Sequence, residues 1–124
     1  MDYQSVTPYL TLDGAAAFIE FVREVFDGKL IRSSTRPDGC LGHSELRIGG
    51  SMVMVSDTTE EWGATPAALL AYVEEVDDVY RRAMERGARS LREPEDTSHG
   101  DRMGGVVDRW GNQWWVATAL DQGG

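Results

Sequence analysis

Residues 11–22 read TLDGAAAFIEFV, and residues 72–83, which lie 61 positions further along the chain, read YVEEVDDVYRRA. In both segments a hydrophobic residue and a carboxylate precede a run of apolar residues at helical spacing. The same shift relates Ala15, Phe18, Ile19 and Val22 to Val76, Val79, Tyr80 and Ala83, and Gly50, Val53 and Val55 to Gly111, Trp114 and Val116. A period of about half the chain predicts one structural unit built twice, because a solenoid needs three or more shorter units.

Each copy is expected to have the element order βαβββ. Asp13 is the expected N-cap of the first helix, and Gly28 is expected to close it. In the first copy we expect a strand over 6–12, a helix over 15–26, and strands over 29–35, 41–48 and 51–56. In the second copy we expect a strand over 67–73, a helix over 76–86, and strands over 88–91, 105–108 and 113–119. Residues 92–100 are expected to form a charged loop. Each helix covers one face of its sheet, so pairing the copies predicts an α+β fold whose curved mixed sheet encloses a concave cleft.

Composition excludes several functional classes. The 124 residues suffice for one domain, no stretch approaches the roughly 20 apolar residues of a membrane span, and residues 1–4 show no secretory signal. The single cysteine, Cys40, excludes an internal disulfide, so a cytoplasmic location is expected. A formal charge of −9 argues against nucleic-acid binding and favours a cationic ligand.

Five short motifs carry a resemblance to a known family. They are VTPYL at 6–10, GHSEL at 42–46, YVE at 72–74, GDR at 100–102 and DRWGNQW at 108–114. With them the chain resembles the glyoxalase/bleomycin-resistance/extradiol-dioxygenase superfamily, also called vicinal oxygen chelate, and within it the PhnB-like branch. The resemblance implies two modules, about 5–57 and 67–120, followed by a flexible tail over 121–124.

The resemblance also supplies a test for metal chemistry. Catalytic members hold a divalent metal through His, Gln or Glu, and the corresponding positions here are Thr7, Met54, Ala68 and Trp115. A thioether is soft, alanine offers no donor atom and an indole N–H can only donate, so we expect the family's metal site, and any other cofactor, to be absent. The metal-dependent glyoxalase and dioxygenase activities are then not expected either.

A different metal site stays open from the residues alone. His43 and Glu45 are two apart on an expected strand and therefore share one face. They could begin a site that His99 and Asp101 complete from a loop. The alternative is that His43 and Glu45 form a hydrogen-bonding pair without a metal.

Strand parity predicts the lining of the cleft. The candidate ligand-binding residues are aromatic, sulfur-containing or polar: Tyr9, His43, Glu45, Met52, Met54, Leu70, Tyr72, Gln113 and Trp115. Such walls suit planar aromatic or extended organic ligands, although the same side chains could also fill an ordinary core. Two further candidates lie outside the strands of the lining. Trp62, in the connector over 58–66, is expected to act as a lid or a dimer contact. Asp101 and Arg102 either form a structural ion pair, or Arg102 binds a ligand carboxylate or phosphate.

Three functions remain open. The first hypothesis is a metal-independent small-molecule binding protein resembling bleomycin-resistance proteins, which sequesters a compound and forms a homodimer. The second is a lyase or isomerase acting on a small carbonyl compound, with His43 as general base and Glu45 orienting it. Residues i and i+2 of a strand lie about 7 Å apart along the backbone, so this pair needs favourable rotamers to touch. The third is a catalytically silent dimerisation module.

Overall fold

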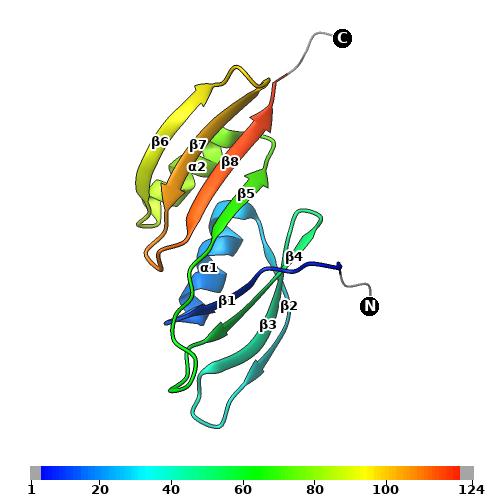
Figure 1. Ribbon diagram of the computed structural model, residues 1–124, viewed down its shortest axis with the longest axis vertical. Coiled ribbons are helices and arrows are strands. Elements are labelled where there is room, and N and C mark those ends of the chain that lie inside the picture. Colours follow the sequence, from blue (N-terminus) through cyan, green and yellow to red (C-terminus); the bar gives the residue numbers. More distant parts are fainter. Residues whose placement is uncertain (1–3, 121–124) are drawn as a thin grey trace. The chain divides into compact units, whose positions relative to one another are not determined.

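The computed structural model describes residues 4–120 and divides into two compact units, residues 1–66 and 67–124 (Figure 1). The tail predicted over 121–124 lies outside the described residues. The elements are β1 (Tyr9–Leu12), α1 (Ala15–Phe26), β2 (Lys29–Thr35), β3 (Leu41–Ile48) and β4 (Ser51–Asp57) in the first unit, and β5 (Ala68–Tyr72), α2 (Val76–Glu85), β6 (Arg89–Asp96), β7 (Asp101–Val107) and β8 (Gln113–Ala119) in the second. The prediction of an α+β fold with the order βαβββ twice is confirmed.

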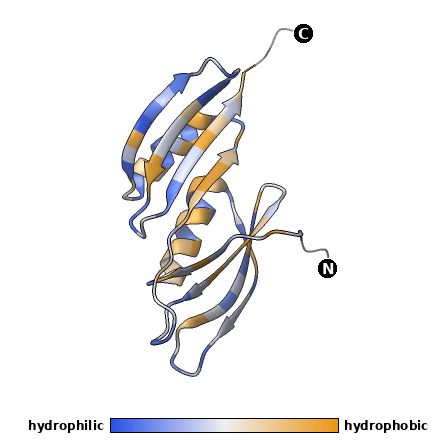
Figure 2. Ribbon diagram, viewed as in Figure 1, coloured by the Kyte–Doolittle hydropathy of each residue, from blue (hydrophilic) through white to orange (hydrophobic). Residues whose placement is uncertain are grey.

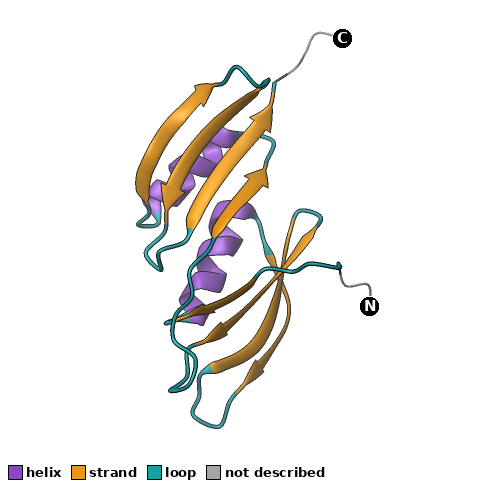
Figure 3. Ribbon diagram, in the orientation of Figure 1, coloured by secondary structure: helices purple, strands orange, loops and turns teal. Residues whose placement is uncertain are grey.

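The two units have the same topology (Figure 3). The first sheet has the strand order β1-β4-β3-β2 and the second the order β5-β8-β7-β6. In each unit the first and last strands pair in parallel, and the remaining neighbours pair antiparallel. Each sheet is therefore mixed, and its helix connects the first strand to the edge strand at the opposite side.

Helix α1 forms where the apolar stripe predicted it, and its buried residues include Phe18, Val22 and Val25. Helix α2 buries a narrower stripe, Val76, Val79 and Ala83, and its other positions are mostly polar (Figure 2). Both helices pack on the strands of their own sheet. The residues of opposite parity to the predicted lining are buried or half-buried, as expected of the side that the helices cover: Leu10, Leu12, Val53, Val55, Leu69, Val73, Trp114 and Val116.

The ends of α1 differ from the sequence prediction. Asp13 is not the N-cap, because Gly14 occupies that position with φ 99° and no side-chain cap of its own. The carboxylate of Asp57, from β4, accepts the first amides of the helix instead. At the other end Asp27, rather than Gly28, adopts the left-handed conformation, and the Gly28 amide donates to the carbonyl of Val22 over 3.2 Å.

The second unit also corrects two strand boundaries. The charged segment 92–100 was predicted as a loop, but β6 extends to Asp96 and β7 begins at Asp101. β6 is an edge strand, and its residues are exposed apart from the half-buried Pro94, so charged side chains fit it without burial. No helix within residues 4–120 is long and apolar enough to cross a membrane.

Candidate functional site

Each sheet has one face covered by its helix and one face turned away from it. We call the latter the first open face in unit one and the second open face in unit two. Strand pairing orders the residues across each open face. Tyr9, Met54, Glu45 and Arg32 follow one another across the first, and Leu70, Trp115, Gly105 and Arg92 follow one another across the second.

A buried carboxylate lies at the centre of the first open face. The side chain of Glu45 is 2% exposed, although it belongs to the face away from the helix. Its Oε2 lies 2.8 Å from Nε2 of His43, and its Oε1 lies 3.8 Å from Nε of Arg32. The direct contact between residues 43 and 45, which required favourable rotamers, is therefore made. A carboxylate in this position needs cationic or hydrogen-bonding partners, because burial without them is strongly unfavourable.

An aromatic surface adjoins this carboxylate. The ring centroids of Tyr9 and His43 are 5.8 Å apart with an interplanar angle of 36°. Tyr9 is 49% exposed and the His43 side chain is 41% exposed, so both rings are accessible. Met54, between the strands that carry them, is half-buried. The first open face thus combines an apolar, aromatic surface with one polar cluster.

Met52 is different from its neighbours on this face. Its residue is only 4% exposed, and Gln4 flanks its backbone. The Met52 amide donates to Oε1 of Gln4 over 3.1 Å, and Nε2 of Gln4 donates to the Met52 carbonyl over 3.0 Å. The structure therefore places the Met52 side chain beneath the accessible surface.

The second open face is more apolar. Leu70 and Tyr72 of β5 are 56% and 65% exposed. The indole of Trp115 lies across Gly105, where an added Cβ would approach Cζ3 of the ring to 2.5 Å. The indole N–H donates to Oε1 of Gln113 over 3.2 Å, which orients the ring. Tyr72, Leu70, Gln113 and Trp115 thus occur together, as strand parity predicted.

Two candidate residues are not strand residues of the open faces. Arg102 pairs across the ladder with Thr118, whose hydroxyl accepts the first amide of α2, so both belong to the helix side of the sheet. Its guanidinium contacts Asp77 at 2.9 and 3.3 Å and Asp96 at 3.1 Å rather than Asp101. Hydrogen bonds to Asp77 and Asp96 raise the pKa of Arg102 above its ordinary value. Trp62 is exposed in a connector turn, where its amide donates to Oγ1 of Thr59.

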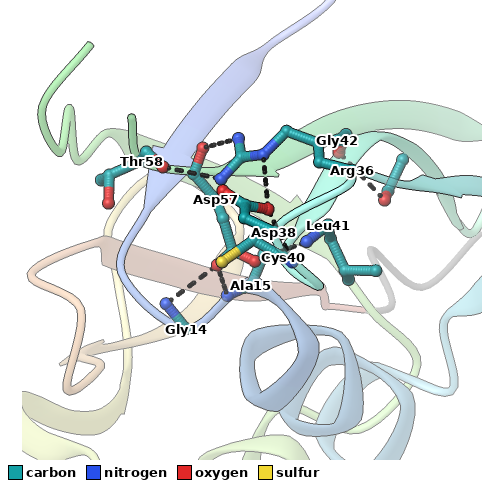
Figure 4. A network of polar contacts seen from close by, with 10 residues as sticks. Gly14, Ala15, Arg36, Asp38, Cys40, Leu41, Gly42, Asp57 and Thr58 are labelled. Carbon is teal, nitrogen blue, oxygen red and sulfur yellow. Dashed lines mark hydrogen bonds and ion pairs between the residues drawn. The ribbon is translucent and has the colours of Figure 1, made fainter. Parts of the chain in front are cut away.

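The sequence did not predict a network of hydrogen bonds around Asp57, which we call the polar junction (Figure 4). Its carboxylate accepts the amides of Gly14 and Ala15 over 3.1 and 2.7 Å and that of Leu41 over 2.7 Å. Arg36 donates to the carbonyls of Asp57 and Thr58 over 3.2 and 2.9 Å. Desolvation raises the pKa of Asp57, but the backbone hydrogen bonds and the charge of Arg36 outweigh it, so the pKa is lowered from 3.8. The junction joins α1, β3 and β4 below the open face.

The residues at the four positions that the resemblance assigns to a metal include none of the carboxylate and imidazole donors usual in such sites. They are Thr7, Met54, Ala68 and Trp115, which offer a hydroxyl, a thioether, a methyl group and an indole N–H that already donates to Gln113. Within residues 4–120 no three His, Cys, Asp or Glu side chains gather into a group that could hold a metal. Asp101, a member of the alternative ligand set, accepts a hydrogen bond from the Thr97 hydroxyl over 2.7 Å.

Comparison with known proteins identifies the family. A model of the glyoxalase/bleomycin resistance protein/dioxygenase superfamily matches residues 7–116. An uncharacterized protein of Mycobacterium bovis is 35% identical over 121 residues, with 89% of this chain and 80% of that protein covered. TioX from Micromonospora sp. ML1 has a TM-score of 0.72 at 26% identity, with 94% of this chain and 100% of TioX covered. A PhnB protein from Bacillus cereus has a TM-score of 0.76 at 20% identity, with 94% and 100% covered, and shares the fold. The chain therefore belongs to the glyoxalase/bleomycin resistance protein/dioxygenase superfamily.

Proposed function

We propose that this protein binds a small organic molecule without a metal ion, in the manner expected of a drug-sequestering member of its superfamily. The proposed ligand is planar and aromatic, and it is neutral or cationic because the chain carries a formal charge of −9. The observation that carries the proposal is the donor chemistry at the inherited metal positions. Thr7, Met54, Ala68 and Trp115 include no carboxylate and no imidazole.

The composition of the open faces supports recognition of an aromatic compound. Tyr9 and Met54 on the first face, and Leu70, Tyr72 and Trp115 on the second, are exposed or half-buried. Aromatic rings bind other rings by stacking and edge contacts, and a thioether adapts to irregular shapes. Large exposed apolar side chains gathered on one face are typical of a binding surface.

Isothermal titration calorimetry with bleomycin and a set of planar acridine and quinoline derivatives tests the proposal. We expect saturable binding of at least one compound, weakened about tenfold by Trp115→Ala because a stacking partner is lost. Trp110→Ala is the matched control, since Trp110 lies in the turn before β8 beneath the Arg109 guanidinium and should leave binding unchanged. An absence of saturable binding by every compound, or equal weakening by the two variants, would contradict the proposal.

A homodimer is part of the proposal, because members of the drug-sequestering kind are commonly dimers. Sedimentation equilibrium at micromolar protein concentration measures the mass directly. A mass near twice 13.7 kDa is expected, and a mass near 13.7 kDa at all concentrations would rule out the dimer.

One contact favours a second candidate function. Because Nε2 of His43 lies 2.8 Å from Glu45, the pair has the geometry of a general base held by a carboxylate. A lyase or isomerase acting on a small carbonyl compound would use such a pair. Screening small carbonyl compounds for turnover tests this, and any activity found should fall at least about a hundredfold in His43→Ala. Activity that survives the substitution would exclude His43 as the base.

A further inference from the structure

The two ring nitrogens of His43 have different surroundings. Nε2 contacts the buried carboxylate of Glu45 at 2.8 Å. Nδ1 has no hydrogen-bond partner among residues 4–120, and the side chain as a whole is 41% exposed. The nearest ring is Tyr9, at 5.8 Å between centroids. The histidine is thus held at one nitrogen, and its other nitrogen has no partner within the described residues.

The partner of Nε2 decides which tautomer is present. Arg32 lies 3.8 Å from the other oxygen of Glu45, which places a cationic side chain beside the carboxylate. An ionised carboxylate can only accept hydrogen bonds, so opposite an ionised Glu45 it is Nε2 of His43 that carries the proton and donates it. In a neutral imidazole Nδ1 then keeps its lone pair and is an acceptor. Arg32 and Glu45 act as positioning residues for that acceptor.

We propose that Nδ1 of His43 accepts a hydrogen bond from an O–H or N–H group on the edge of a neutral aromatic ligand whose ring packs against Tyr9. This inference rests on the proposed function and specifies its ligand class. The acceptor at Nδ1 requires a donor, the half-exposed Tyr9 ring favours an aromatic body, and the net charge of −9 disfavours an anion. Glu45 cannot replace His43 as the acceptor for the ligand, because its carboxylate is buried and contacts His43 and Arg32.

The tautomer can be tested without any ligand. Long-range ¹H–¹⁵N correlation spectra of the imidazoles at neutral pH distinguish a protonated Nε2 from a protonated Nδ1. We expect His43 to show the Nε2–H form, and the spectrum of His43→Gln identifies which of the two histidine signals belongs to His43. A dominant Nδ1–H form would overturn the inference.

A matched pair of compounds tests the hydrogen bond itself. 2-Naphthol and 2-methoxynaphthalene have the same ring system, but only the first has an O–H donor. Calorimetry should show 2-naphthol binding about fivefold more tightly, the usual worth of one net hydrogen bond. In His43→Phe the aromatic ring is kept but both ring nitrogens are gone, so the acceptor is lost and the two compounds should bind equally.

The outcomes separate this inference from the function on which it rests. Equal binding of the two naphthalenes to the wild type, or a preference that persists in His43→Phe, would overturn the hydrogen bond to Nδ1. If acridine or quinoline compounds bind but neither naphthalene does, the ligand class named here is wrong while metal-independent binding stands. If no compound of either set binds, both proposals fail.

Discussion

The two sheets share one strand order and pairing pattern but differ in the side chains on their open faces. At equivalent ladder positions the first face has Tyr9, Met54 and Glu45, and the second has Leu70, Trp115 and Gly105. The carboxylate in one unit is thus replaced by a glycine in the other, and that glycine leaves space for the Trp115 indole. One backbone arrangement therefore supports a polar anchor in the first unit and an apolar surface in the second.

The start of the helix in each unit is stabilised by a related contact, but the two contacts differ in strength. In each unit a side chain of the last strand accepts the first amide of the helix. In unit one it is the charged Asp57, which accepts three backbone amides. In unit two it is the neutral Thr118, which accepts the Val76 amide over 2.8 Å and donates to the Val73 carbonyl over 3.0 Å. The turn before the last strand also differs, since only the second is built around a buried carboxylate, Asp108.

The largest expected effect is the loss of the Asp108 carboxylate. Asp108 is 4% exposed and accepts four hydrogen bonds, from the amides of Trp110 and Asn112, from Nδ2 of Asn112 and from Nε1 of Trp114. Asp108→Ala leaves buried donors without this acceptor and should lower the free energy of unfolding by about 4 kcal/mol. Urea denaturation measures the change.

Asp38→Ala is the control in the first unit, because Asp38 is an exposed turn carboxylate that accepts the Cys40 amide over 2.9 Å. It should cost far less than Asp108→Ala. Similar losses from the two substitutions would contradict the importance given to the burial of the Asp108 carboxylate.

The two helix caps provide the next comparison. Asp57→Ala should lower the free energy of unfolding by about 2 kcal/mol, because a charged acceptor of three amides is lost. Thr118→Ala should cost about 1 kcal/mol, the usual value for a neutral cap. Thermal and urea unfolding measure both. If the charged cap stabilises its helix more than the neutral cap, the loss of unfolding free energy must be larger for Asp57→Ala than for Thr118→Ala. The reverse order would disprove this.

The pH dependence of stability follows from the lowered pKa of Asp57. Because the folded-state pKa lies below the ordinary value of 3.8, the stabilisation is fully present above that value and is lost as pH falls through the folded pKa. The gap in unfolding free energy between the wild type and Asp57→Asn should therefore narrow as pH falls from about 5 toward 2. Because both proteins contain the other carboxylates, the effects of their titration cancel in the difference between the two unfolding free energies. A gap that does not change with pH would contradict the role of the charge.

The smallest expected effect concerns the second open face. Gly105→Ala forces the indole of Trp115 to move, since the new Cβ would lie 2.5 Å from the ring. The ring is only half-buried, so the stability loss should stay within about 1 kcal/mol, while near-ultraviolet circular dichroism and the affinity for acridine compounds should change. Gly50→Ala, at a turn with open space around the added Cβ, should alter neither. Unchanged spectra in Gly105→Ala would show that the ring does not lie over the glycine.

Periodicity and repetition predicted the fold well, because the features that determine it are local. The bounds of α1, β2, β3 and β8 follow from apolar spacing and turn residues near each end. The same alternation placed His43 and Glu45 on one face. The charged edge strand β6 escaped prediction because exposed strand residues need no alternation of apolar and polar side chains.

Features that depend on residues far apart in the chain could not be predicted. The cap of α1 is Asp57, which is 42 residues from Ala15, whereas the local candidate was Asp13. The ion pair of Glu45 with Arg32 joins two strands whose pairing is irregular beside Arg32, which no local pattern reveals. Trp115 was expected on the second open face, but its position over Gly105 follows from the pairing of β7 with β8.

Calorimetric titration with the tightest-binding aromatic compound, before and after extensive chelation of the protein, tests metal-independent recognition most directly. Metal content is measured on the same samples. We predict the same dissociation constant in both titrations, and no change when Zn²⁺, Ni²⁺ or Mn²⁺ is added back. Binding that disappears on chelation and returns with about one equivalent of one of these ions would contradict the account.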